Sequence, residues 1–379
     1  MLSFQVYEPL VRGGNHLDDG LLAHASTLQV VNTAFGRFWE LTLRIEGGHS
    51  QIDDWIADGT ARHVELYNHG TAEIWEGFVN TVDANIGSLT ISIGPVLEMA
   101  NKVKCVYSYV DTSITPPAVG MRDFTSWYED ATSQEQYGTI EKVISVGGAS
   151  PTNAIQIAQT ALADRKNPPR REVDNLESVV RPSATIRCLG YIHWTRLYTY
   201  TSVNTGDETA STKLQNIINA DPNSFLSTDF TGVETNATNV RAWEDEYRTA
   251  WNLIKGLASL GDSSYDRWLI GFGKDRIPTY AALPSSVKYQ RSLSAPRQQV
   301  ETYKVGSGVM PWDVDVGEWC FYTDLLIGRP QPNERRLDPR FLFVEQTAYT
   351  MPWGLTLEGG TAARLDQLLA QLGLAGASA

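Results

Sequence analysis

The sequence predicts a β-rich α+β protein in which two barrel-like β-domains are joined by smaller α/β subdomains. Short runs of β-forming residues, divided by Gly, Asn and Asp, dominate both ends of the chain. Helical patterns occur in the middle and at the C-terminal end. The 11 Trp and 16 Tyr residues also favour strands. With 379 residues, of which 42% are hydrophobic, the chain can bury sizeable cores in roughly two to three domains.

Composition changes divide the chain into four segments. They are a first β-barrel-like domain (1–112), an α/β subdomain (113–182), a mixed α+β region with a long helix (183–296), and a second β-domain with a C-terminal helix (297–379). The first segment contains strand-like runs at 38–45, 61–70, 72–83, 88–96 and 103–113.

After a predicted linker at 115–120, residues 133–171 form the best-specified unit of the chain. An apolar run over 140–146 predicts a strand, and Gly147–Gly148 predicts a turn. Ser150 is a candidate N-cap for a helix that ends before Pro168–Pro169. The unit contains no His, Cys or paired carboxylates, so it is interpreted as a structural module.

The rest of the chain alternates between strands and helices. The predicted elements are strand-like residues 184–203, a helix at 213–220, a long amphipathic helix at 239–261, a hairpin at 267–281, strands within 297–357 and a helix at 361–372.

The net charge of −13 argues against a protein that grips nucleic acid, although an acidic wall would let DNA pass without sticking. Cys105, Cys188 and Cys320 form no CxxC pair, so neither a disulfide framework nor a zinc site is expected. The N-terminus lacks a signal-peptide pattern, and no run approaches the length of a membrane span. We expect a soluble protein without stable membrane insertion.

Several clusters could carry chemistry, and each has a simpler interpretation. The carboxylates of Asp53–Asp54, Asp313/Asp315 and Glu244–Asp245–Glu246 could serve glycoside hydrolysis, but solvated surface acids are favoured. His63 and His69 lack a recognised zinc spacing. Ser307 lies outside a G-x-S-x-G elbow. We therefore predict no catalytic, cofactor-binding or metal-binding residues.

Four further patterns resemble binding sites. GFGKDR (271–276) lacks the residues of a phosphate loop and fits a hairpin, and RKNPPRR (165–171) fits a helix end with a linker. Asn236–Ala237–Thr238 matches a glycosylation sequon, which has no meaning without secretion. Tryptophans such as Trp75 and Trp127 could form a sugar platform, but core or interface positions are favoured.

The order of these pieces resembles the tail-hub proteins of tailed bacteriophages. The likeness rests on EIWEGFVNTVD with LTISIGPVLEMANKVKCVYSY (73–83, 89–109), the strand–helix segment SQEQYGTIEKVISVGGASPTNAIQIAQTALADRKNPPRREV (133–173), RWLIGFGKDRIPTYAALPSSVKYQRSL (267–293), GEWCFYTDLL (317–326) and FLFVEQTAYTMPWGLTLEGGTAARLDQLLAQL (341–372). These segments are spread between residues 73 and 372 of the chain.

The resemblance implies a non-enzymatic virion protein without cofactors, assembled in the host cytoplasm. It implies a homotrimeric ring at the distal end of the tail tube, in which each subunit lends two β-domains. The implied partners are a tail-tube or distal-tail ring protein, a tape-measure protein and a central tip, spike or fibre protein, with DNA only in transit. Two alternatives stay open: a carbohydrate-binding or carbohydrate-active β-protein for host attachment, and another tail ring such as a sixfold distal-tail adaptor.

Overall fold

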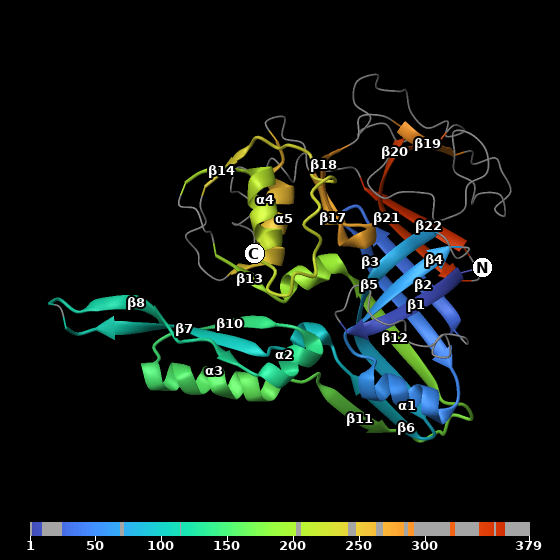
Figure 1. Ribbon diagram of the computed structural model, residues 1–379, viewed down its shortest axis with the longest axis horizontal. Coiled ribbons are helices and arrows are strands. Elements are labelled where there is room, and N and C mark those ends of the chain that lie inside the picture. Colours follow the sequence, from blue (N-terminus) through green and yellow to red (C-terminus); the bar gives the residue numbers. More distant parts are fainter. Residues whose placement is uncertain are drawn as a thin grey trace.

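A 14-stranded sheet organises the computed structural model (Figure 1). The structure describes residues 2–9, 25–68, 72–113, 115–201, 206–241, 248–262, 268–283, 287–291, 319–322, 341–351 and 354–360. The main path of the sheet runs β1-β4-β5-β12-β3-β2-β21-β20-β19. Helices pack beside this sheet, and a smaller sheet carries its own helix. The predicted β-rich α+β class is confirmed.

The bounds of the strands on the main path are β1 Leu2–Pro9, β2 Ala25–Thr33, β3 Gly36–Glu46, β4 Arg62–Asn68, β5 Ala72–Ile86, β12 Ser183–Gly190, β19 Val287–Arg291, β20 Trp319–Tyr322 and β21 Phe341–Met351. The attached strands are β6 Leu89–Ile93, β11 Arg170–Asp174, β17 Trp268–Phe272, β18 Pro278–Ala282 and β22 Gly354–Gly360. The pairings are antiparallel except β17 with β3 and β19 with β20.

Strand β12 lies between β3 and β5 and is hydrogen-bonded to both along its length. It comes from the third sequence segment, whereas its two neighbours come from the first. Through the pairing of β2 with β21, strands of the fourth segment join the same sheet. The hydrogen bonding of this sheet is therefore continuous across all four segments, and their division into domains remains a prediction.

The sheet buries one face of its strands in a core closed by a short helix, α1 (His49–Asp58). Alternation in β3 turns Leu41, Leu43 and Ile45 inward, since neighbouring side chains of a strand point to opposite faces. From α1, Ile52 and Trp55 enter the same core. The sequence predicted only strands here, because two apolar positions three residues apart are too weak a helical signal.

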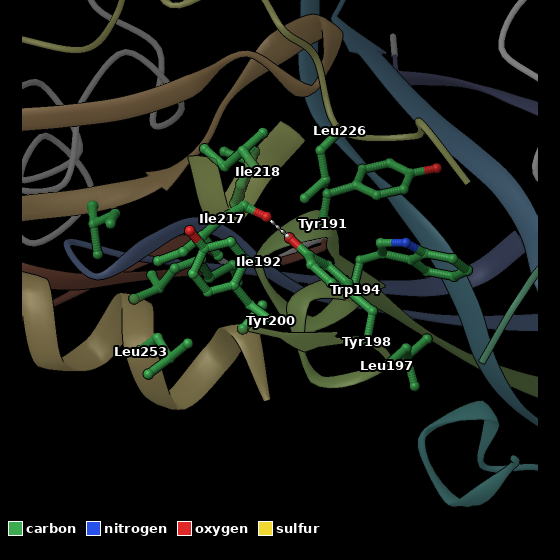
Figure 2. Packing of buried hydrophobic residues seen from close by; sticks show 14 of the residues in the cluster. Tyr191, Ile192, Trp194, Leu197, Tyr198, Tyr200, Ile217, Ile218, Leu226 and Leu253 are labelled. Atoms are coloured by element: carbon green, nitrogen blue, oxygen red, sulfur yellow. Dashed lines mark hydrogen bonds between the residues drawn. The ribbon is translucent and has the colours of Figure 1, made fainter. Parts of the chain in front are cut away.

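A second core forms where helices cover the edge of the sheet near β17 and β18 (Figure 2). Its helices are the 3-10 helix η3 (Tyr191–Arg196), α4 (Ala210–Asn219) and α5 (Ala250–Leu260). Four short strands pair beside them, β13 Thr199–Tyr200 with β16 Arg248–Thr249 and β14 Glu208–Thr209 with β15 Asn239–Val240. The Tyr198 hydroxyl donates to Ile217 O at 3.1 Å, which links η3 to α4.

Two predictions for this region are corrected. The strand expected over 184–203 ends at Gly190, and η3 follows it. At Gly190 the backbone runs against β3, where a Cβ would lie 1.8 Å from Phe38 O, so only glycine allows the approach. The helix expected over 239–261 begins at Ala250, after residues in β15 and β16. The helix predicted at 213–220 is confirmed as α4.

The smaller sheet confirms the module predicted at 133–171. Its strands are β7 Lys102–Asp111, β8 Ala118–Phe124, β9 Tyr128–Glu129 and β10 Glu141–Val146, in the order β10-β7-β8 with β9 also on β7. Ser150 Oγ accepts a hydrogen bond from Asn153 N at 3.2 Å and caps α3 (Pro151–Arg165). A short helix not predicted from the sequence, α2 (Ala131–Tyr137), precedes β10.

In place of the expected linker at 115–120, β8 begins at Ala118 and pairs with β7. The resulting hairpin projects away from the rest of the molecule (Figure 1). The hairpin predicted at 267–281 is confirmed by the antiparallel pair β17–β18. The helix predicted at 361–372 lies outside the described residues. None of the described helices is long and apolar enough to cross a bilayer.

Candidate functional site

Strand β4 carries a polar face against the aromatic side chains of its neighbours. Its alternation turns Val64 and Leu66 into the sheet core and places His63, Glu65 and Tyr67 on the other face. Charged and imidazole groups are rarely buried without partners. This face is therefore the strongest candidate for functional chemistry.

His63 and Glu65 lie at the centre of a hydrogen-bonded network. His63 Nε2 lies 2.9 Å from Glu65 Oε1, and His63 Nδ1 lies 2.7 Å from the Tyr191 hydroxyl in η3. A carboxylate only accepts, so Nε2 donates to Glu65, while Nδ1 and the Tyr191 hydroxyl share the second hydrogen bond. Glu65 Oε2 accepts from the hydroxyls of Tyr7 and Tyr67. Three donors thus converge on one carboxylate.

Beside this network a buried ion pair joins β5 to the β17–β18 turn. Arg276 Nε donates to Glu76 Oε1 at 2.9 Å, and the Arg276 backbone N–H donates to Glu76 Oε2 at 3.2 Å. The guanidinium lies 4.5 Å from the centroid of the Tyr191 ring. Asp275 and Arg276 both have left-handed backbone angles, at φ 59° and 58°. Glu76 therefore binds both the guanidinium of Arg276 and the strained backbone of this turn.

Neighbouring groups push the pKa values of two carboxyls in opposite directions. Burial alone would raise the pKa of Glu65, but hydrogen bonds from His63, Tyr67 and Tyr7 lower it to about 2. Burial, followed by the charge of Glu76, raises the pKa of Glu73 on β5 well above its usual value. Burial and the hydrogen bond to Glu65 raise the pKa of Tyr7 to about 12.

Carboxyls with separated pKa values are the pattern expected of an acid–base site. Glu65 already accepts from three side chains, and Glu76 binds Arg276 through both oxygens. These carboxylates are committed to the protein rather than to a ligand. Among the described residues, no group of three or more His, Cys, Asp or Glu could hold a metal ion.

A second buried histidine lies in an aromatic setting between β3, η3 and α5. The ring of His193 meets Trp39 edge-on at 4.2 Å and stacks on Trp251 at 5.9 Å between centroids. Burial, with a smaller contribution from Arg196, lowers the pKa of His193 to about 3. The Arg196 guanidinium lies 4.4 Å from the centroid of Trp251. A neutral histidine among aromatic rings fits a packing role.

The structure places several sequence candidates in structural roles. Asn236 of the sequon is buried and donates to Gly261 O and to the Tyr280 hydroxyl, at 3.1 and 2.9 Å. Residues 271–276 form the end of β17 and the turn that contains Arg276, as expected for a hairpin. At the end of α3, Lys166 Nζ lies 2.9 Å from Asp130 Oδ2.

The tryptophan platform needs a correction. Trp75 is fully buried in the sheet core, 6.4 Å from Phe38 between ring centroids, so it cannot stack on a sugar. Trp127 is partly exposed, and the amines of Lys102 and Lys104 lie 5.1 and 5.0 Å from its ring centroid. Two protein cations already lie against that ring.

The carboxylate candidates are not brought together by the described residues. Asp53 and Asp54 are exposed on α1, on the side away from Ile52 and Trp55. The remaining candidates lie outside the described residues, namely His69, Glu244, Asp245, Glu246, Ser307, Asp313 and Asp315.

Exposed apolar side chains gather in two places away from the cores. The β7–β8 hairpin exposes Val110, Val119, Met121 and Phe124, and Val119 is 82% exposed. The other set follows β11 and includes Leu176 and Val180, which are essentially fully exposed. Exposed apolar residues in sets of this kind are typical of protein–protein contacts.

Neither a protein-family model nor a curated protein matches the sequence. Two solved structures align over most of the chain. The tail protein from Neisseria meningitidis MC58 aligns at TM-score 0.44 and 8% identity, covering 97% of this chain and 99% of that one. The 43 kDa tail protein of prophage MuSo2 from Shewanella oneidensis aligns at TM-score 0.40 and 7% identity, covering 95% and 97%. Alignments this weak carry no argument about function, which has to come from the residues themselves.

Proposed function

We propose that the chain is a non-enzymatic structural component of a bacteriophage tail, and specifically the hub that forms a trimeric ring at the distal end of the tail tube. The observation that carries the proposal is the projecting β7–β8 hairpin with its exposed apolar residues. The base of the hairpin packs in a small core with α3, but Val110 and Val119 toward its tip are exposed. The apolar surface of the tip favours contact with another protein.

The polar interior supports the same role. Its polar groups are bound to one another: His63 to Glu65, Glu76 to Arg276, and Lys213 to Glu208 at 2.7 Å. The pair of Glu76 and Arg276 joins β5 to the β17–β18 turn. A rigid interior with a projecting apolar hairpin suits a part whose task is assembly. The acidic net charge of −13 suits a ring through which DNA passes.

Electron microscopy of purified virions tests the proposal. Gold-labelled antibody against the chain is expected at the tail tip, and quantitative mass spectrometry is expected to give three copies per virion. Absence of the chain from virions would overturn the tail assignment. Six copies would instead identify a sixfold adaptor ring, and labelling at the capsid would contradict the hub.

Carbohydrate binding is the competing proposal, and glycan-array binding by the purified chain is its direct measurement. The burial of Trp75 removes one of the two tryptophans that favoured it. Binding that is lost in Trp127→Ala but kept in Trp39→Phe would support host attachment over assembly.

A further inference from the structure

Several strands have one open edge among the described residues, and two of them, β8 and β11, also have exposed side chains. Among the described residues, β8 is hydrogen-bonded only to β7 and β11 only to β6. All five residues of β11 are exposed, and so are the side chains of residues 119–124 in β8. An open edge offers unpaired N–H and C=O groups to another strand. The two strands lie in different parts of the molecule, one in the projecting hairpin and one beside β6 (Figure 1).

We propose that β8 of one subunit pairs antiparallel with β11 of a second copy of this chain. This contact deepens the proposed function, because it would be the contact between neighbours in the ring. It joins two different surfaces of the same chain, so it is heterologous. Heterologous contacts close into rings or extend as filaments, whereas a contact between identical surfaces gives a closed dimer.

Charge and apolar contact together favour one register for this pairing. With Arg122 opposite Glu172, Asp123 falls opposite Arg171 and Met121 falls opposite Val173. These three central pairs are either of opposite charge or apolar, and both kinds stabilise a sheet. A shift of two residues in one direction would bring Arg122 opposite Arg170, which repels.

The backbone of β8 fits this register. Thr125 N donates to Cys105 O at 2.9 Å, so the backbone groups of Thr125 point toward β7. Successive residues of a strand direct these groups to opposite edges, and the ladder irregularity between Tyr109 and Val110 lies beyond this stretch. Arg122 therefore presents its N–H and C=O to the open edge.

The backbone of β11 fits as well. Asn175 N donates to Ser88 O at 2.6 Å, so Asn175 points its backbone groups toward β6. By the same alternation, Glu172 presents its groups outward. Arg122 and Glu172 would then form a hydrogen-bonded pair, while Met121 and Val173 would form the closer, non-hydrogen-bonded pair. A shift of one residue would set an outward residue against an inward one and break the ladder.

The side chains of the proposed contact are available for it. Met121 is 42% exposed and Val173 is 38% exposed. Glu172 binds Arg170 within its own strand, and Asp123 accepts from Tyr107 at 2.9 Å, but exposed pairs of this kind contribute little and can share a partner. Beyond the paired residues, Val119 is brought toward Leu176, so the two exposed apolar sets would cover one another.

Cysteine cross-linking tests the register on the full chain. In the variant Met121→Cys/Val173→Cys, opposed cysteines of a non-hydrogen-bonded pair lie within disulfide reach. Oxidation is expected to give a covalent ladder that ends at trimer on a non-reducing gel. The matched control, Met121→Cys/Glu172→Cys, places the second thiol on the opposite face and is expected to give much less. Equal cross-linking in the two variants would overturn the register.

A charge swap tests the same contact without cysteine. Arg122→Glu is expected to weaken self-association by at least about tenfold in analytical ultracentrifugation, because two carboxylates then oppose each other. Glu172→Arg is expected to do the same, and the double variant Arg122→Glu/Glu172→Arg is expected to recover the association. Failure of the double variant to recover, or a wild-type chain that stays monomeric at hundreds of micromolar, would overturn the contact.

These outcomes separate the contact from the proposed function. If the chain is found at the tail tip but the cysteine pair does not cross-link, the proposed tail function stands and the proposed β8–β11 contact is refuted. If the cysteine pair cross-links in register but the chain is absent from virions, the proposed contact stands and the proposed tail function is refuted.

Discussion

The two polar regions of this protein use charge in opposite ways. Around β4 and β5, Glu65 and Glu76 each have several hydrogen-bond partners, and Glu76 and Arg276 are both almost fully buried. Along β8 and β11, charges of both signs lie on exposed strands and make few contacts within the chain. The interior charges therefore hold together segments that are far apart in the sequence. The charges on the edge strands β8 and β11 are available for contacts with another protein chain.

The largest expected effect is at Arg276. Arg276→Met would leave the Glu76 carboxylate buried without its cation, which should lower the free energy of unfolding by about 3–5 kcal/mol. Urea unfolding followed by tryptophan fluorescence measures it. The matched control is Arg170→Met, which removes an exposed ion pair to Glu172 and should cost about 0–1 kcal/mol. Equal losses in the two variants would erase the distinction between the interior and the edge.

A smaller loss is expected at Asn236, a neutral group inside the second core. Asn236→Ala should cost about 1–3 kcal/mol, because Gly261 O and the Tyr280 hydroxyl lose their buried partner. Thermal unfolding by circular dichroism provides the measurement. Asn175→Ala, at an exposed asparagine that bonds Thr90, is the control and should leave the transition nearly unchanged. A silent Asn236→Ala would mean that water replaces these bonds.

The interior charges also predict a pH dependence. The raised pKa of Glu73 means that the folded protein holds a proton that the unfolded chain has already released. Stability should therefore fall as the pH rises from the usual carboxyl pKa toward the raised one. Glu65 works in the opposite sense: its pKa of about 2 adds stability above pH 4.5 that is lost as the pH falls toward 2.

Glu73→Gln isolates the first of these effects. The variant should show a flatter decline of the denaturant midpoint with rising pH, and it should be more stable than the wild type at the alkaline end. Glu172→Gln, at an exposed position of β11, should follow the wild-type curve. A Glu73→Gln curve that parallels the wild type would place that carboxyl in a solvated setting.

The smallest effect on folding is expected at the edge itself. Val119→Thr should change the free energy of unfolding by no more than about 0.5 kcal/mol, because the side chain is exposed. Val79→Thr buries a hydroxyl in the sheet core and should cost about 1–3 kcal/mol. Differential scanning fluorimetry of the pair, with sedimentation of Val119→Thr to record association, makes the comparison. A marked loss of stability in Val119→Thr would show that the hairpin supports its own subunit.

Local signals explain which elements the sequence predicted well. The module at 133–171 follows from neighbouring residues, with Ser150 capping α3 and Gly148 turning the chain at φ 64°. The segment after Gly190 was assigned to a strand because Tyr191, Ile192 and Trp194 are β-formers. Packing against the second core overrode that preference, as tertiary contacts often do.

The candidate site was harder to predict because its parts are far apart in the sequence. Glu76 and Arg276 are separated by 200 positions, and no local pattern relates them. One signal was available: the alternation His63, Glu65, Tyr67 against Val64 and Leu66 marks a strand with a polar face. This alternation indicates that polar side chains share one face of the strand, but it does not indicate which distant residues bind them.

The place of β12 has a consequence for how the chain is made. The ribosome synthesises β3 and β5 long before β12 (Ser183–Gly190), the strand that pairs with both of them. Until residue 190 has been synthesised, the edges of β3 and β5 in the nascent chain lack a partner and can pair with other chains. Translation that stalls before β12 should therefore yield aggregates, and the late strand acts as the closing piece of co-translational folding.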